Sequence, residues 1–98
     1  MNNQQIVDDI VSHITKNGGN FPGWYVGIAA DPRARLFKDH NVMEVGGKWI
    51  FAPAQSNQDA RNVEEYLINR YKTKGDVGGG DDLTVFVYAY PITQSTKE

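Results

Sequence analysis

The stretch WYVGIAADPRARLFKDH, residues 24–40, reads as a short strand that passes directly into a helix. The strand covers residues 24–29. Asp31 is a favourable N-cap and Pro32 suits the first helical position, so a regular helix is expected from Asp31 to His40. The unit carries a tyrosine, a glycine suited to close approach, two arginines and a histidine. It is a common βα arrangement and also a surface suited to handling phosphate.

Length and composition limit the chain to one modest domain. A chain of 98 residues holds a single core, so residues 1–98 are expected to form one domain. Hydrophobic residues make up 40% and charged residues 22%, as in ordinary globular proteins. The formal net charge of −2 lacks the basic footprint of a dedicated nucleic-acid binder, so any such binding has to come from a local patch.

Cysteine usage and the N-terminal sequence bear on the compartment. The chain has no cysteine, which excludes a disulfide framework and a thiolate metal site. Its first residues have neither a cationic start nor an apolar leader, and no apolar run reaches membrane length. A soluble, cytoplasmic protein without a membrane partner is the expectation.

Apolar residues at helical spacing predict two further helices. The first spans residues 3–16, and its stripe either packs on the body of the domain or forms the interface of a homodimer. Asn17-Gly18-Gly19 ends this helix through left-handed conformations. The second spans residues 56–71, because Ser56 with Asp59 resembles a capping box with Asp in place of Glu.

Two more segments read as strands. Residues 48–52 are rich in side chains that suit a pleated surface, and Pro53 ends them. Residues 83–90 are apolar or aromatic on both faces, which predicts a central strand covered on both sides. The expected fold is therefore α+β, a small, mostly antiparallel three-stranded sheet flanked by three helices, with a frayed tail at residues 94–98.

One carboxylate stands out on the helix at 56–71. At 100° per residue, Glu64 falls inside the apolar arc formed by Ala60, Val63 and Leu67, while Glu65 points away from it. A carboxylate in such a place is costly unless it is paired, hydrogen-bonded or bound to a cation. Glu64 therefore needs a reason that packing alone does not supply.

The segment 72–82 is too rich in glycine for a regular element. Backbone N–H groups of residues 75–82 would suit a phosphate. Three aspartates at positions 76, 81 and 82 place negative charge in the same loop, which favours a flexible hairpin or lid instead.

Four features in order resemble the GIY-YIG nuclease module. Tyr25-Val26-Gly27 is followed ten residues after the tyrosine by Arg35, then by His40, a strand, and a helix with Glu64 in the pattern Ala-x-x-x-Glu-x-x-Leu-Ile. The resemblance covers residues 24–68. It implies a GIY-YIG-like fold and a metal-dependent phosphodiesterase or nuclease.

Residue by residue, the resemblance implies catalytic roles for Tyr25 and Arg35 on the attacking water and the scissile phosphate. It implies that Glu64 is catalytic and holds Mg²⁺, since a single carboxylate with substrate oxygens can seat the hydrated ion. Gly27, Arg33 and Lys74 are the expected substrate contacts. Three of these residues also have a structural interpretation. Tyr25 suits a core aromatic, Gly27 suits strand–helix packing, and the stem of Arg33 can cover apolar surface.

The chain departs from the family pattern at its first strand, which would carry the first tyrosine. A helix and a turn occupy that position. We expect the C-terminal strand, residues 85–90, to take the missing strand's place beside Tyr25, as in a permuted chain. Tyr88 or Tyr90 then stands in for the first tyrosine as a catalytic residue.

The expected catalytic histidine, His40, is also displaced. It follows Arg35 by five residues, where the family spacing is four, so on a regular helix it points about 100° away. Asp39 occupies the expected position, and Arg35 with Asp39 would otherwise form an i,i+4 surface ion pair. The asparagine that the family carries downstream of its glutamate has no clear match.

Two functions remain open. The first is a metal-dependent nuclease of GIY-YIG type that acts on nucleic acid. The second is a relative that has lost catalysis and binds a nucleotide, a small anion or a protein.

Overall fold

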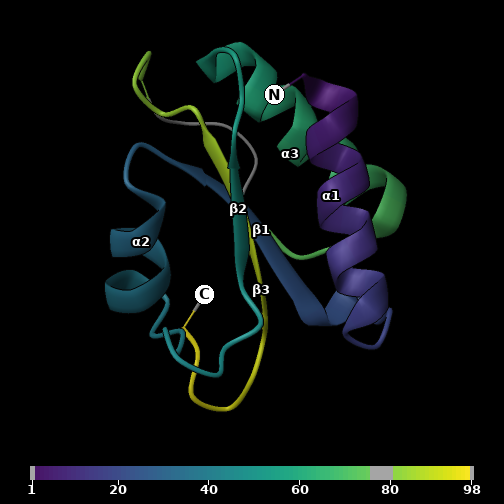
Figure 1. The fold of residues 1–98 in the computed structure, drawn as a ribbon, viewed down its shortest axis with the longest axis vertical. Coiled ribbons are helices and arrows are strands. Elements are labelled where there is room, and N and C mark those ends of the chain that lie inside the picture. The colour runs from purple at the N-terminus through teal and green to yellow at the C-terminus, as the bar shows by residue number, and fades with distance from the viewer. Residues whose placement is uncertain (1, 76–80, 98) are drawn as a thin grey trace.

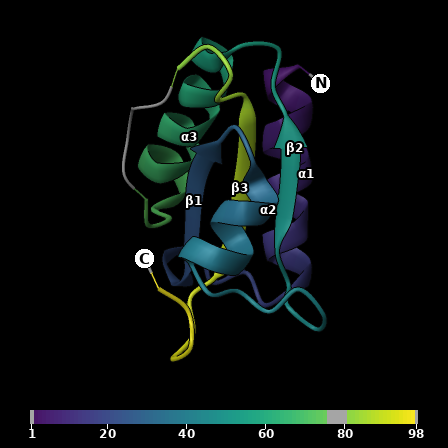
Figure 2. The ribbon, with the colours of Figure 1, turned by 90° about the vertical axis from the view of Figure 1, so that its left-hand side faces the viewer.

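The structure is a computed structural model, which describes residues 2–75 and 81–97. It is an α+β domain with an antiparallel three-stranded sheet in the order β1-β3-β2, as the sequence predicts. Helices α1 (Asn3–Lys16) and α3 (Asn57–Tyr71) cover one face of the sheet. The short helix α2 (Pro32–Ala34) and the π-helical turn η2 (Arg35–Asp39) lie on the other face (Figures 1 and 2).

Strand β3 (Phe86–Pro91) is the centre of the sheet, which confirms the prediction from its two apolar faces. It pairs antiparallel with β1 (Trp24–Ala29) on one side and with β2 (Ile50–Pro53) on the other. In this register Tyr25 lies opposite Tyr90, and Gly27 lies opposite Tyr88. The C-terminal strand thus takes the position beside β1 that the permuted arrangement requires.

The first core lies between the sheet and helices α1 and α3. The apolar stripe of α1 is buried there, so this stripe packs on the body of the domain. Its principal members are the α1 residues Ile6, Ile10 and Ile14, the α3 residues Ala60, Val63 and Leu67, and the strand residues Trp24, Val26, Ile28, Val87 and Ala89. Helix α1 starts with a capping box between Asn2 and Gln5 and ends before Gly18 and Gly19, both at positive φ.

The second core lies between the sheet and the α2–η2 segment. Since side chains alternate along a strand, the residues of β1 and β3 that do not face the first core point here. This core contains Tyr25, Leu36, Val42, Tyr88 and Tyr90, with Phe37, Trp49 and Phe51 packed at its edge.

The segment after Asp31 is not a regular helix, and our expectation was wrong for its second half. Asp31 does cap the first turn, its Oδ1 accepting from the Ala34 N–H at 3.2 Å. From Arg35 onward the turn widens into a π-helix, in which the His40 N–H donates to the Arg35 carbonyl at 2.9 Å. His40 therefore stands one full turn after Arg35, the relation that the fourth residue has in an α-helix.

The sequence predicts a frayed tail at residues 94–98, but the described part of this tail, up to residue 97, is hydrogen-bonded to the rest of the domain. The Lys97 N–H donates to the His40 carbonyl at 2.7 Å, and the Asn41 side-chain amide donates to the Ser95 carbonyl at 2.7 Å. The Thr93 N–H donates to the Thr96 hydroxyl at 2.9 Å, which closes a turn between them. These bonds hold the segment against the end of η2, on the α2 side of the sheet (Figure 1).

A short segment after α3 extends the outer edge of β1. The Val26 N–H donates to the Lys74 carbonyl at 2.9 Å, and the Lys74 N–H donates to the Trp24 carbonyl at 2.8 Å. The predicted phosphate cradle, hairpin or lid at residues 75–82 falls mainly on residues 76–80, which lie outside the described residues. Within the described ranges, no helix is both long and apolar enough to cross a bilayer.

Gly27 provides a direct test of the sheet register. A Cβ at this position would lie 2.5 Å from Cζ of Tyr88 and closer still to its hydroxyl, so Gly27→Ala has to displace the buried ring. We expect it to lower the free energy of unfolding by about 1–3 kcal/mol, the usual cost of overpacking. Urea denaturation measures this cost.

The control repeats the substitution in a Tyr88→Leu background, where the atoms that would clash are absent. The cost of Gly27→Ala should disappear there. An equal cost in both backgrounds would mean that the Tyr88 ring does not lie over Gly27.

Candidate functional site

The candidate site is built around the hydroxyl of Tyr88. Tyr88 lies on the central strand with 2% of its surface exposed, and its ring crosses the neighbouring strand β1 above Gly27. The absence of a side chain at Gly27 makes this crossing sterically allowed. Gly27 therefore serves the placement of Tyr88.

His40 joins the two tyrosines of β3. Its Nε2 lies 2.7 Å from the Tyr88 hydroxyl, and its Nδ1 lies 2.9 Å from the Tyr90 hydroxyl and 2.6 Å from the Lys97 carbonyl oxygen. The imidazole is 5% exposed, so these contacts are made away from bulk water. We call Tyr25, His40, Tyr88 and Tyr90 the tyrosine–histidine cluster.

Tyr25 completes the cluster by stacking. Its ring centroid lies 4.8 Å from that of His40, 5.4 Å from Tyr90 and 6.5 Å from Tyr88. Its planes with the two tyrosines differ by only 23° and 21°. Offset stacking at such distances is favourable beyond the buried area itself.

The electrostatic surroundings of Tyr88 link it to the other predicted catalytic residues. Burial raises the pKa of the Tyr88 phenol well above its ordinary value, and Tyr25, Glu64 and Asp39 raise it further. Arg35 acts in the opposite direction and lowers it. Tyr25, Arg35 and Glu64 therefore all lie within electrostatic reach of one hydroxyl, and that hydroxyl is protonated at neutral pH.

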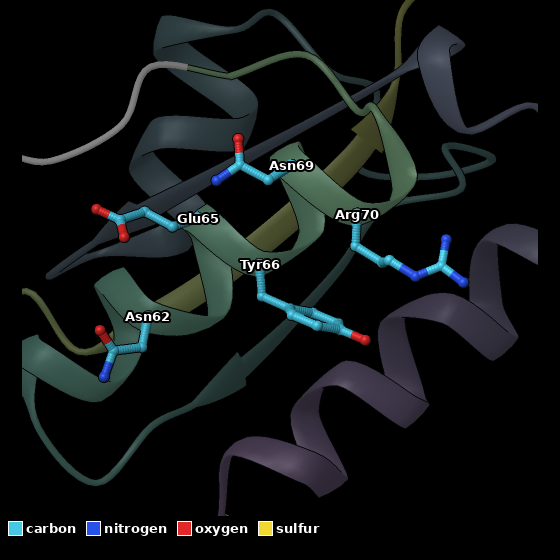
Figure 3. Close-up of a pocket in the computed structure, with 5 residues that line it drawn as sticks. All are labelled: Asn62, Glu65, Tyr66, Asn69 and Arg70. Carbon is cyan, nitrogen blue, oxygen red and sulfur yellow. The ribbon is translucent and has the colours of Figure 1, made fainter.

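Glu64 is turned inward on α3, as the helical projection predicts, with 1% of its surface exposed. Its neighbour Glu65 points away from the sheet on the outer face of α3 (Figure 3). In residues 2–75 and 81–97, no three His, Cys, Asp or Glu side chains are grouped so as to hold a metal ion. Any Mg²⁺ near Glu64 would depend on this carboxylate, water and substrate oxygens.

The predicted cationic residues lie at the surface. Arg35 forms an ion pair with Asp39, with Nε and Oδ2 3.5 Å apart and both side chains more than half exposed. The sequence predicts this i,i+4 ion pair as the structural alternative to a catalytic role for Arg35. Lys74 is exposed, and its backbone forms a parallel bridge with Tyr25, so it lies beside the cluster.

Arg33 belongs to a different surface. Its guanidinium lies 5.7 Å from the ring centroids of both Trp49 and Phe51, and its Nη1 lies 3.3 Å from Oε2 of Glu44. It covers aromatic surface at the β2 edge, in agreement with its structural interpretation. The structure does not bring Arg33 to Tyr88.

No known protein family, curated protein or solved structure matches this chain. The GIY-YIG resemblance therefore stays a hypothesis.

A hollow of about 490 Å³ lies elsewhere, on the outer face of α3 (Figure 3). It is lined by Asn62, Glu65, Tyr66, Asn69 and Arg70, none of which is a predicted site residue. It is wide open to solvent, and the side chains that line it are exposed or half-buried. We therefore place the candidate site at the tyrosine–histidine cluster.

Sequence reasoning missed the contribution of the backbone of Lys97. Its carbonyl oxygen also accepts a hydrogen bond from the Tyr90 hydroxyl at 3.2 Å. A backbone carbonyl leaves no mark in the sequence, so no motif could have identified it. The two tyrosines were recognisable because both point to one face of the same strand.

Loss of the Tyr88 hydroxyl should destabilise the protein in a pH-dependent way. Tyr88→Phe leaves the buried Nε2 of His40 without a partner and is expected to lower the free energy of unfolding by about 1–3 kcal/mol at neutral pH. Tyr66→Phe, on the exposed side of α3, is the control and should cost less than about 0.5 kcal/mol.

The difference in the free energy of unfolding between wild type and Tyr88→Phe should decrease at alkaline pH. Because the Tyr88 pKa is raised in the folded protein, the unfolded chain loses this proton first, above the ordinary tyrosine pKa of about 10. The contribution is thus fully present below that pH and is lost as pH rises, by up to about 1.4 kcal/mol per pH unit. Urea denaturation over a pH series measures it, and a constant gap between wild type and Tyr88→Phe through this range would contradict it.

Proposed function

We propose that the protein hydrolyses phosphodiester bonds in nucleic acid at the tyrosine–histidine cluster. The observation that carries the proposal is the buried cluster in which His40 is hydrogen-bonded to Tyr88 and stacked on Tyr25. The charges of Arg35 and Glu64 both affect the pKa of the Tyr88 hydroxyl. The sequence predicts a role for each of these five residues.

His40 and Tyr88 form a path for a proton. In this path Nδ1 of His40 carries the hydrogen of the neutral ring and donates it to the Lys97 carbonyl oxygen, which only accepts, and Nε2 is the acceptor. Tyr88 then donates its hydroxyl hydrogen to Nε2 at 2.7 Å. A water that gives a proton to the Tyr88 oxygen, as Tyr88 passes its own to His40, becomes the nucleophile at phosphorus.

The raised pKa of Tyr88 bears on this path. A free phenolate in the buried site is unfavourable, so the two proton movements have to be coupled and the negative charge stays on the attacking oxygen. The new bond joins the water oxygen to phosphorus, the bond to the ester oxygen breaks, and that oxygen takes a proton from solvent.

Arg35 and Lys74 provide the positive charge that the acidic chain otherwise lacks. Both are exposed and adjacent to the cluster, and a phosphate that approaches Tyr88 can exchange the Asp39 partner of Arg35 for its own oxygens. Glu64 suits a hydrated Mg²⁺, which when bound supplies Lewis-acid stabilisation of the phosphate oxygens.

The π-helical turn supports the family resemblance. It absorbs the additional residue between Arg35 and His40, so the two residues keep the relation of an i,i+4 pair although they are five apart. π-Bulges of this kind occur frequently at functional sites.

Cleavage assays test the proposal directly. Wild-type protein with Mg²⁺ is expected to cleave single-stranded DNA, double-stranded DNA, RNA or bis(p-nitrophenyl) phosphate. Glu64→Gln and Tyr88→Phe should each lower kcat/KM by about 10²-fold or more. Glu65→Gln is the matched control, since it removes the neighbouring charge on the outer face and should leave the rate unchanged.

Equal rates for wild type, Glu64→Gln and Tyr88→Phe on every substrate would remove the proposal. Folding of each variant is verified by circular dichroism, so that a loss of rate is not a loss of structure.

The second candidate is a binding module without catalysis, which recognises a nucleotide, a small anion or a protein. The observations that favour it are the burial of Tyr88 and His40 and the pairing of Arg35 with Asp39. Saturable binding of a nucleotide, weakened by Arg35→Ala and accompanied by no cleavage, would select this function.

A further inference from the structure

His40 is held from two opposite sides. Tyr88 contacts Nε2, and the backbone of Lys97 contacts Nδ1 on the other side of the ring. The C-terminal segment 93–97 therefore does not lie between His40 and Tyr88. It lies behind the imidazole, in the position from which a group orients a catalytic base.

The contact with Lys97 decides which nitrogen carries the proton. Nδ1 has two neighbours, the Lys97 carbonyl oxygen at 2.6 Å and the Tyr90 hydroxyl at 2.9 Å. The carbonyl has no hydrogen to donate, so the shorter contact is a hydrogen bond when Nδ1 carries the hydrogen, and the Tyr90 hydroxyl then points its hydrogen at the carbonyl. Neutral imidazole has one N–H, so Nε2 is left as an acceptor and Tyr88 becomes the donor. The Tyr90 hydroxyl, 3.2 Å from the same carbonyl, donates to it as well.

The backbone of the segment is held in place by the carbonyl of His40 and by the side chain of the next residue, Asn41. The Lys97 N–H donates to the His40 carbonyl, and the Asn41 amide donates to the Ser95 carbonyl. The backbone of Lys97 thus contacts His40 through both its N–H and its C=O. The Lys97 side chain takes part in none of these bonds.

We propose that residues 93–97 act as a positioning element, in which the Lys97 carbonyl fixes His40 as the Nδ1–H tautomer and thereby directs the Tyr88 hydroxyl toward Nε2. The tautomer assignment stands independently, while its catalytic consequence rests on the proposed phosphodiesterase function. Without this carbonyl, Nε2 is free to carry the hydrogen, and the Tyr88–His40 proton path is reversed.

The chain contains an internal reference for the measurement. It has two histidines, and the other one, His13, contacts the Lys48 carbonyl through Nε2 at 2.7 Å. By the same reasoning His13 carries its hydrogen on Nε2. The two histidines of one protein are therefore expected to be opposite tautomers.

The experiment is ¹⁵N–¹H correlation NMR of the imidazole rings in the full chain, at a pH where both rings are neutral. Wild type should show Nδ1–H for His40 and Nε2–H for His13. A double variant, Asn41→Gly with Lys97→Pro, removes both anchors of the segment. Asn41 has φ +55°, which glycine adopts readily, and proline at 97 has no N–H to donate to His40.

The matched control is Lys97→Ala, which keeps the backbone and should retain the wild-type tautomers. In the double variant, the Nδ1–H signal of His40 should give way to Nε2–H or to a mixture, while His13 stays unchanged. Wild-type His40 in the Nε2–H form would overturn the proposal without any variant. An unchanged His40 tautomer in the folded double variant would overturn it too.

Activity separates this inference from the proposed function. In an active protein the double variant should lose about 10²-fold in kcat with little change in KM, because it disturbs the base and not the phosphate contacts. A wild type that shows the predicted tautomers but cleaves nothing counts against the phosphodiesterase and supports the positioning role of Lys97.

Discussion

The hydrogen bond between Tyr88 and His40, with the Tyr88 ring lying across Gly27, is the constraint on which this face of the protein depends. It requires the β1–β3 register, because a shift by one residue would place a side chain under the ring and turn Tyr88 to the opposite face. It requires the π-helical turn, which delivers His40 to the sheet. Tyr25 and Tyr90 then fill the space on either side of the imidazole.

Much of the fold was predictable because its signals are local or periodic. The stripe of α1, the N-cap at Ser56 and the two-sided apolarity of β3 each follow from the spacing of a few residues. The inward placement of Glu64 follows from the same helical projection. Each of these depends on a regular element, for which sequence spacing translates directly into direction.

Other features depend on tertiary contacts that have no local signal. The sequence around Arg35 suits an α-helix, whereas the π turn places His40 where it binds two tyrosines of a distant strand and Lys97. The polar sequence at the C-terminus resembles a frayed tail. The bonds that anchor it involve backbone atoms, such as the Lys97 N–H and the Ser95 carbonyl, and such bonds leave no pattern in the sequence. Strand ends were also displaced: the sequence predicts 83–90, whereas β3 begins at Phe86, after a turn in which the Thr84 N–H donates to the Asp81 carbonyl.

The candidate site also combines residues that could be predicted from the sequence with residues that could not. Tyr25, His40 and Tyr88 were found from the motif and pack together, and Glu64 is buried on α3 as its projection predicts. Arg33 was selected on the same basis and lies over Trp49 and Phe51 instead, because a long flexible side chain follows the nearest aromatic surface. Motif order locates backbone positions well and the ends of long side chains poorly.

The strand order β1-β3-β2 has a consequence for how the chain folds. Strands β1 and β2 do not pair with each other, so, apart from the short bridge between Tyr25 and Lys74, neither has a ladder partner until residues 86–91 arrive between them. Sheet formation must therefore wait for the closure of long loops, which is typical of slow, high-contact-order folding. During synthesis on the ribosome, helices α1 and α3 can form early, but the sheet cannot assemble until the last strand has emerged.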